Sequence, residues 1–272
     1  MAKAIFLRPA DQVLSSATLS LATGTLASGY ALANLHDGNP AKPMLLTAAT
    51  TWYLLIDYGA SVTKAIKAAY FFGHNFDPGT TIVVQGNASN SWGAPTVNQS
   101  VTVPADAADG YGQDFVWLLA SQTTALRYWR IGSTATNSAA WRLGELVITD
   151  TVSRDLPFEN FQPTLALSDV RVGGVEHVTP SGVSLRYQAP SRVVTLSGEI
   201  KGTRAELLEV RDWLRACGGR GTPTAFILED DDSNKECFFV VPEGNDFNFQ
   251  HLAGGIWHAT LSLRTLSNGV PA

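Results

Sequence analysis

The sequence predicts a mainly β protein of two domains, with a single helix in the second. Short apolar or alternating stretches, separated by turn residues, recur along the chain, as in sandwiches built from many short strands. Only residues 202–219 carry the full spacing of an amphipathic helix. At 272 residues the chain also exceeds the usual size of one domain, so two domains are expected.

The first 150 residues are expected to form a β-sandwich or jelly roll. Residues up to about 30 are predicted as weak strands or an arm, and Asp37-Gly38-Asn39-Pro40 then dictates a tight loop. About eight short strands are predicted without a convincing helix among them. The clearest candidates are residues 52–59, 65–72, 80–85, 100–103, 114–119, 126–131 and 143–149. Such a series is typical of sandwiches and jelly rolls.

A polar stretch that ends at Pro157 marks the predicted domain boundary. One domain is placed over residues 1–150 and the other over residues 151–272.

The sequence indicates where the predicted helix begins and where it ends. Thr203 and Glu206 have the spacing of a capping box, and Gly218 offers a left-handed residue to close the helix. One arc of the helix is apolar and consists of Leu207, Val210, Trp213, Leu214 and Cys217. Strands are predicted around it, over residues 192–200, 224–228, 237–241 and 255–266. A helix this short cannot bury its apolar arc alone, so it must lie across a sheet.

Composition narrows the classes of function. The net charge of −5 and the lack of a basic run argue against binding to a nucleic-acid backbone. No apolar stretch has the length of a signal-peptide core at the start or of a membrane span elsewhere, so we expect a soluble protein without membrane insertion. Cys217 and Cys237, at a helix end and in an apolar strand, suit two buried thiols better than a disulfide.

Motifs of catalysis are missing from the sequence. It contains no G-x-S-x-G nucleophile elbow, H-E-x-x-H zinc motif, phosphate loop or dinucleotide fingerprint. The five histidines are not spaced to share a metal on one element. We therefore expect no enzyme activity and no required cofactor, although paired carboxylates for glycoside hydrolysis could still be brought together by folding.

Four motifs in order resemble the galactose-binding-like, or discoidin-type, jelly roll. They are the Asp37-Gly38 loop, the Trp52-x-x-x-Ile56-Asp57-x-Gly59 strand, the Arg127-Tyr128-Trp129-Arg130-Ile131 strand and the closing Gly144-Glu145-Leu146-Val147-Ile148. The resemblance covers roughly residues 31–149. It implies a domain that is not catalytic and binds glycans, or sometimes other surfaces, through loops at one end of the sandwich.

The same resemblance implies a structural calcium ion. In that family calcium often sits in the Asp-Gly loop, held by loop oxygens and by a glutamate of the last strand; Asp37, Asn39 and Glu145 match those positions. Oxygen ligands of this kind suit a hard cation. In the alternative interpretation, Asp37 and Asn39 merely cap their own turn through hydrogen bonds to nearby backbone.

Aromatic and polar residues in the loops are candidates for a glycan site. A pyranose ring needs an aromatic platform and polar groups beside it. The residues that could supply both are His74, Asn75, Asn90, Trp92 and Tyr111. Alternatively, Trp92 is a buried anchor of the sandwich.

The second half resembles the tube proteins of tailed bacteriophages and the distal tail protein that caps the tube. The resemblance covers roughly residues 165–266 and rests on the order of strands, helix, hairpin and long final strand. It implies a β-sandwich or barrel with one flanking helix, whose subunits close into a ring around passing DNA. Distal tail proteins usually carry the tube-like domain first, whereas here it comes second.

Together the two resemblances predict a structural protein of a phage tail tip or baseplate, which could also contribute to attachment to host-surface glycans. It would assemble in the bacterial cytoplasm and be part of the virion. Its expected partners are further copies of itself in a hexameric or trimeric ring and the tube, hub and fibre proteins, with DNA only as passing cargo. The final strand and the charged hairpin tip at residues 229–236 are candidate contacts between subunits. The alternative is a carbohydrate-binding module of a bacterial protein, without catalytic activity.

Overall fold

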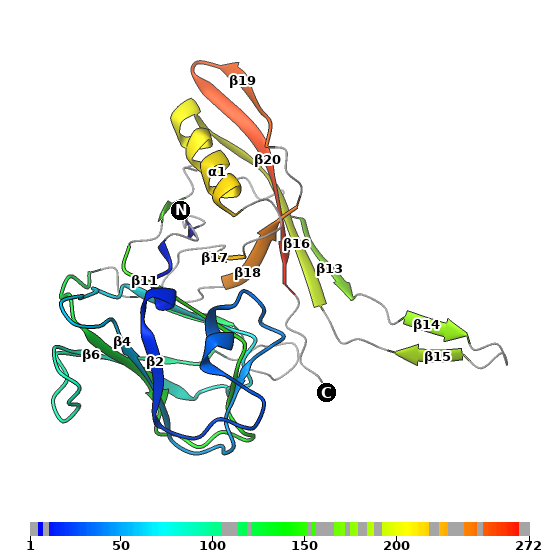
Figure 1. Ribbon diagram of the computed structural model, residues 1–272. Coiled ribbons are helices and arrows are strands. Elements are labelled where there is room, and N and C mark those ends of the chain that lie inside the picture. Colours follow the sequence, from blue (N-terminus) through cyan, green and yellow to red (C-terminus); the bar gives the residue numbers. More distant parts are fainter. Residues whose placement is uncertain are drawn as a thin grey trace. The chain divides into compact units, whose positions relative to one another are not determined.

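The computed structural model describes residues 5–7, 11–104, 114–118, 121–151, 154–155, 166–171, 175–178, 184–187, 192–217, 223–227, 237–243 and 247–266. In these residues the chain is mainly antiparallel β with a single α-helix, which confirms the predicted fold class (Figure 1). The chain divides into two compact units, Met1–Leu156 with Thr224–Phe238, and Pro157–Pro223 with Phe239–Ala272. This division places residues 224–238 in the first unit, whereas the predicted second domain covered residues 151–272.

The first unit contains two antiparallel sheets. The larger has the strand order β2 (Thr18–Thr23), β4 (Trp52–Asp57), β9 (Tyr128–Ser133), β6 (Thr81–Asn87) and β7 (Val97–Thr102). The smaller has the order β11 (Glu145–Thr149), β5 (Ala68–Phe72) and β8 (Phe115–Leu118). Two 3-10 helices, η2 (Leu14–Ser16) and η3 (Leu32–His36), and the short pair of β3 (Met44–Leu45) with β10 (Arg142–Leu143) complete the unit's main part.

One apolar core fills the space between these sheets. Along β4, Trp52, Leu54 and Ile56 are fully buried, and the residues between them are half-buried, which is the period of two expected for a strand with one inward face. The smaller sheet contributes Phe71, Phe115 and other residues to the same cluster. A shared core between two antiparallel sheets makes this part of the first unit a β-sandwich.

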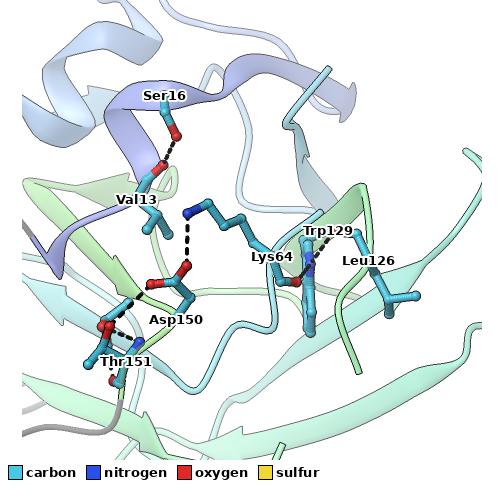
Figure 2. A network of polar contacts seen from close by, with 8 residues as sticks. Val13, Ser16, Lys64, Leu126, Trp129, Asp150 and Thr151 are labelled. Atoms are coloured by element: carbon cyan, nitrogen blue, oxygen red, sulfur yellow. Dashed lines mark hydrogen bonds and ion pairs between the residues drawn. The ribbon is translucent and has the colours of Figure 1, made fainter. Parts of the chain in front are cut away.

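Polar contacts close the end of the sandwich at which β11 finishes (Figure 2). The ammonium of Lys64 lies 2.8 Å from Oδ2 of Asp150, so the segment after β4 is tied to the residue that follows β11. The indole N–H of Trp129 donates to the carbonyl oxygens of Lys64, at 3.0 Å, and of Leu126, at 3.2 Å. Both loops at this end are thereby fixed to the core.

The first unit also has a strand pairing between distant parts of the chain. β1 (Ile5–Phe6) pairs antiparallel with β12 (Arg154–Asp155) and with β17 (Thr224–Ile227). The amide of Leu7 donates to the carbonyl of Ala225 at 3.2 Å. These pairings account for the assignment of residues 224–238 to the first unit.

The second unit is organised around two long paired strands. β16 (Arg192–Thr203) pairs with β20 (Ile256–Thr265) and with β13 (Ala166–Arg171). The last three residues of β18 (Cys237–Pro242) pair with β20, and β19 (Phe249–Ala253) also pairs with β20. A separate hairpin is formed by β14 (Val175–Val178) and β15 (Ser184–Tyr187). This reproduces the predicted order of strand, helix and long final strand, but the predicted tip at residues 229–236 lies outside the described residues.

The helix α1 (Arg204–Ala216) begins at the predicted capping box. The Thr203 amide donates to Oε2 of Glu206 at 2.6 Å, and the Glu206 amide donates to Oγ1 of Thr203 at 3.4 Å. The helix contacts β16 and β20, and its predicted apolar arc is buried except for the half-buried Leu214. Cys217 and Cys237 are buried and form no disulfide, as predicted. None of the helices in the described residues is long and apolar enough to cross a membrane.

Candidate functional site

Strand direction separates the predicted glycan residues into two groups. The loop before β6, residues 73–80, and the loop after it, residues 88–96, lie at opposite ends of this strand. A strand of seven residues is roughly 20 Å long. His74 and Asn75 precede β6, Asn90 and Trp92 follow it, and Tyr111 lies outside the described residues. The described members of the predicted set therefore do not form one site.

His74 and Asn75 hold their loop against the sandwich. The His74 side chain is buried, with its ring centroid 4.6 Å from that of Phe76 and 5.2 Å from that of Phe115. The Asn75 side chain donates to the carbonyl of Ala140 at 2.8 Å, and its Oδ1 accepts from an amide of the same segment, that of Arg142, at 2.9 Å. In the described structure both side chains are engaged in anchoring.

Trp92 and Asn90 instead lie next to the outward face of the larger sheet. Trp92 is half-buried, and its indole N–H donates to Oδ1 of the exposed Asn90 at 2.8 Å. The Cζ atom of Arg130, on β9, lies 4.5 Å from the centroid of the Trp92 ring. From the neighbouring strand β4, the ring centroid of Tyr53 lies 4.2 Å from the same atom. The guanidinium group is therefore contacted by two aromatic rings, from the two sides of β9.

A row of polar contacts continues across the same face. Nε of Arg130 donates to Oε1 of Gln85 on β6 at 2.6 Å, and Nε2 of Gln85 donates to Oδ1 of Asn98 on β7 at 2.7 Å. Burial lowers the pKa of the Arg130 guanidinium below its usual value, but a shift of this kind leaves it charged near neutral pH. We call the set Tyr53, Gln85, Asn90, Trp92, Asn98 and Arg130 the outer-face cluster.

Only two residues of this cluster, Asn90 and Trp92, were identified from the sequence. The alternation of inward and outward residues along the strands could have indicated Arg130 and Tyr53. Because Trp129 is buried, Arg130 must face outward, and because Trp52 is buried, Tyr53 must face outward as well. The contact between these side chains depends on the register of three strands, which the sequence does not state.

The neighbouring arginine differs from Arg130 in its partner. Arg127 donates to both carboxylate oxygens of Asp57, at 2.7 Å and 2.9 Å, and these hydrogen bonds hold the pKa of Asp57 below its usual value. Arg130 has no carboxylate partner among the residues that the structure describes.

The three residues predicted to hold calcium lie together at the start of β11. The Gly38 amide donates to the Glu145 carboxylate, at 3.2 Å and 3.4 Å from its two oxygens. Oδ1 of Asp37 accepts from the Asn39 amide at 2.9 Å, and Oδ1 of Asn39 accepts from the Ala41 amide at 3.2 Å. The two loop residues therefore cap their own turns, as the alternative interpretation expected, while the loop also contacts Glu145.

Close backbone packing holds this loop against β11. A Cβ atom on Gly144 would lie 2.4 Å from the carbonyl oxygen of Pro40, which is too close for any other residue to fit without a shift of the backbone. Glycine at position 144 thus lets the loop reach the buried Glu145.

Burial raises the pKa of Glu145 to about 8, and the charge of Asp37 acts in the same direction. The amides of Gly38 and Asn39 oppose the shift in part. Glu145 as a whole residue is 1% exposed, so its carboxylate is charged at neutral pH only at a cost that a bound cation would offset. The donor set of two carboxylates and an amide oxygen fits a calcium ion, although the described residues hold no group of three His, Cys, Asp or Glu that could bind a metal.

Comparison with known proteins gives matches in solved structures alone: no protein-family model and no curated protein matches the chain. One solved structure is CpGH89CBM32-6 produced by Clostridium perfringens, with 14% identity and a TM-score of 0.34 over 50% of this chain and 94% of that chain. Another is CBM32-1 from a family 31 glycoside hydrolase of the same organism, with 12% identity and a TM-score of 0.38 over 52% and 99%. A third is the lectin domain of lectinolysin complexed with Lewis B antigen, with 14% identity and a TM-score of 0.37 over 50% and 94%. At this identity and TM-score, the likeness assigns no ligand to this chain.

The raised pKa of Glu145 gives a testable dependence of stability on pH. Between about pH 4.5 and 8 the folded protein keeps a proton on Glu145 that the unfolded chain releases, so the free energy of unfolding should fall as the pH rises through this window. The slope from one such group is at most about 1.4 kcal/mol per pH unit. Thermal unfolding in chelator at pH 5 and pH 8 should show a smaller loss in Glu145→Gln than in the unsubstituted protein.

The control is Glu199→Gln, which alters a carboxylate that is 55% exposed and should leave the loss unchanged. An equal loss of melting temperature in Glu145→Gln and in the unsubstituted protein would show that Glu145 does not titrate in this way.

Proposed function

We propose that the first unit binds carbohydrate through the outer-face cluster and catalyses no reaction. The observation that carries this proposal is the half-buried Trp92, which Asn90 and Arg130 hold in place beside polar side chains of the sheet. Sugar rings stack on aromatic faces, and planar polar side chains hydrogen-bond to their hydroxyl groups. The sandwich fold and the resemblance to galactose-binding-like domains agree with this function.

Trp92 can serve as an anchor and as a platform at the same time. One face of its ring contacts the guanidinium of Arg130, which fixes the loop that follows β6. The residue is only half-buried, so part of its surface is open to a ligand. A rigid aromatic side chain loses little conformational entropy on binding.

Removal of the Trp92 ring tests this function. Binding of the full chain to a panel of neutral and acidic oligosaccharides, measured by calorimetry, should weaken by about tenfold or more in Trp92→Ala, because truncation of a central aromatic contact commonly costs more than 1 kcal/mol. The matched control is Tyr30→Ala, which removes an aromatic side chain that is 38% exposed and lies outside the cluster. If the unsubstituted protein binds none of the sugars, or binds them equally well in Trp92→Ala, the proposal is wrong.

We further propose a structural calcium ion held by Asp37, Asn39 and Glu145. Support comes from the buried Glu145 carboxylate and from its position beside the loop that contains Asp37. A bound divalent cation would supply charge that offsets the burial of the carboxylate, and would fix the loop on β11. The ion has no catalytic role in this proposal.

Calcium should therefore raise the melting temperature of the protein above its value in chelator. At a concentration a hundredfold above the dissociation constant, the expected stabilisation is about 2.7 kcal/mol. The increase should be lost in Glu145→Gln and retained in Glu243→Gln, which alters a carboxylate of the second unit. An unchanged melting temperature in millimolar calcium at pH 7.5 would remove the metal from the proposal.

As a second candidate function, we propose that the chain is a structural protein of a phage tail tip, with the second unit forming a hexameric or trimeric ring. It would assemble in the bacterial cytoplasm, contact tube, hub and fibre proteins, and let DNA pass as cargo. The order of β16, α1 and β20 agrees with the resemblance to tube-type domains. The specific observation in its favour is an apolar hairpin tip, at which Leu252 is 52% exposed and Ile256 is 50% exposed.

This tip is the end of the β19 and β20 hairpin (Figure 1). Its turn uses Gly254 and Gly255, with φ of 59° and 80°, as a tight two-residue connection requires. Large apolar side chains on such a turn gain stability when a neighbouring subunit covers them, and closed rings provide such a contact.

The double substitution Leu252→Asp and Ile256→Asp should prevent ring formation and leave the monomer folded, because both side chains are exposed in it. Light scattering coupled to size exclusion and electron micrographs of assembled tails provide the measurement. The control is Val62→Asp, at a position of the first unit that is 43% exposed. A chain present in the particle as an isolated monomer, without symmetric copies, would exclude the ring.

A further inference from the structure

The edge of the Arg130 guanidinium is a donor that the described structure leaves available. Its Nε atom donates to Gln85, but its two terminal amino groups have no hydrogen-bond partner among the residues described. No described carboxylate neutralises its charge, in contrast to the bidentate pair of Arg127 with Asp57. A half-buried cation of this kind has more to gain from an anionic ligand than one that is fully hydrated.

The guanidinium is also held in position before any ligand binds. The ring centroids of Tyr53 and Trp92 lie 4.2 Å and 4.5 Å from its Cζ atom, so the plane of the group cannot turn freely. Gln85 fixes the Nε side and is itself fixed by Asn98 at 2.7 Å. A donor that is ordered in advance loses little entropy when it binds, and this favours affinity and selectivity.

Planar carboxylates match such a group best. A guanidinium presents parallel N–H bonds that pair with the two oxygens of a carboxylate, and these charge-assisted bonds are stronger than bonds to neutral hydroxyl groups. A sugar whose ring carries a carboxylate substituent could bind Arg130 through that carboxylate while its ring contacts Trp92, because the side chains of Arg130 and Trp92 are in contact.

We infer that the outer-face cluster selects acidic sugars, with the carboxylate of a uronic acid residue bound by the terminal amino groups of Arg130 and the sugar ring placed on Trp92. The inference rests on the proposed carbohydrate-binding function and adds the class of sugar. Gln85 and Asn98 act as positioning residues for Arg130.

Matched probes separate the carboxylate from the rest of the sugar. Calorimetry with the full chain would compare oligomers of galacturonate, glucuronate and mannuronate with their methyl esters, which keep the ring and lose the charge. At least one acid should bind about tenfold more tightly than its ester, since a charge-assisted hydrogen bond is stronger than one between neutral groups. A sulfated oligosaccharide of equal charge should bind more weakly than that acid.

Variants then assign the preference to Arg130. Arg130→Gln should lower the ratio of acid to ester affinity to about one, and Arg130→Lys, which keeps the charge but loses the planar fork, should give an intermediate ratio. Lys201→Gln removes a positive charge from the second unit and should leave the ratio unchanged. Melting temperatures of all variants would show that each is folded.

The possible outcomes distinguish the inference from the function on which it rests. Binding of neutral sugars that depends on Trp92, without preference for any acid over its ester, would overturn the inference and leave the carbohydrate-binding function standing. Equal or tighter binding of the sulfated probe, or an unchanged preference in Arg130→Gln, would also overturn the inference. Binding of no sugar at all would overturn both.

Discussion

The register between β4 and β9 is the constraint on which the sandwich and its outer face both depend. Leu54 is opposite Ile131 and Ile56 is opposite Trp129, and all four side chains are fully buried. A slip of one residue would exchange the inward and outward sets, so burial of the core also determines that Arg130 faces outward. Gly132 fits the same register, because a Cβ atom there would lie 2.0 Å from the carbonyl oxygen of Trp52.

The two polar features of the first unit, around Glu145 and around Arg130, differ in how their charge is balanced. Glu145 is the first residue of a fully buried strand and relies on the amide of Gly38. Burial therefore favours its neutral form unless a cation is present. Arg130 keeps its charge, because the ordinary pKa of a guanidinium lies far above neutral pH. Two aromatic rings and an amide oxygen contact it in place of part of its water. An anion can approach Arg130 without displacing a protein carboxylate.

The parts of the fold that were predicted correctly depend on patterns among residues close together in the sequence. The capping box at Thr203 and the alternation in β4 and β20 each involve neighbours in the sequence, and the structure has them as expected. The pairing of Ile5 with Ile227 could not be predicted in this way, because it joins segments that are far apart in the sequence, through a register that only the folded protein specifies. The prediction of glycan-binding residues had the same limit. His74 and Trp92 are both aromatic residues in polar loops, but only the folded structure shows that Phe76 and Phe115 cover His74.

Arg127, just before β9, and Arg130, within it, show why residue type alone does not define a binding group. Arg127 and Arg130 are three positions apart, and each contacts an aromatic ring, Tyr128 in one case and Tyr53 with Trp92 in the other. Asp57 satisfies Arg127 with two hydrogen bonds, so an anionic ligand would have to compete with a protein carboxylate there. At Arg130 the corresponding partner is the neutral Gln85, which fixes the group without neutralising it. Arg130 is thus oriented but not neutralised, and the proposed recognition of an acidic sugar depends on this difference from Arg127.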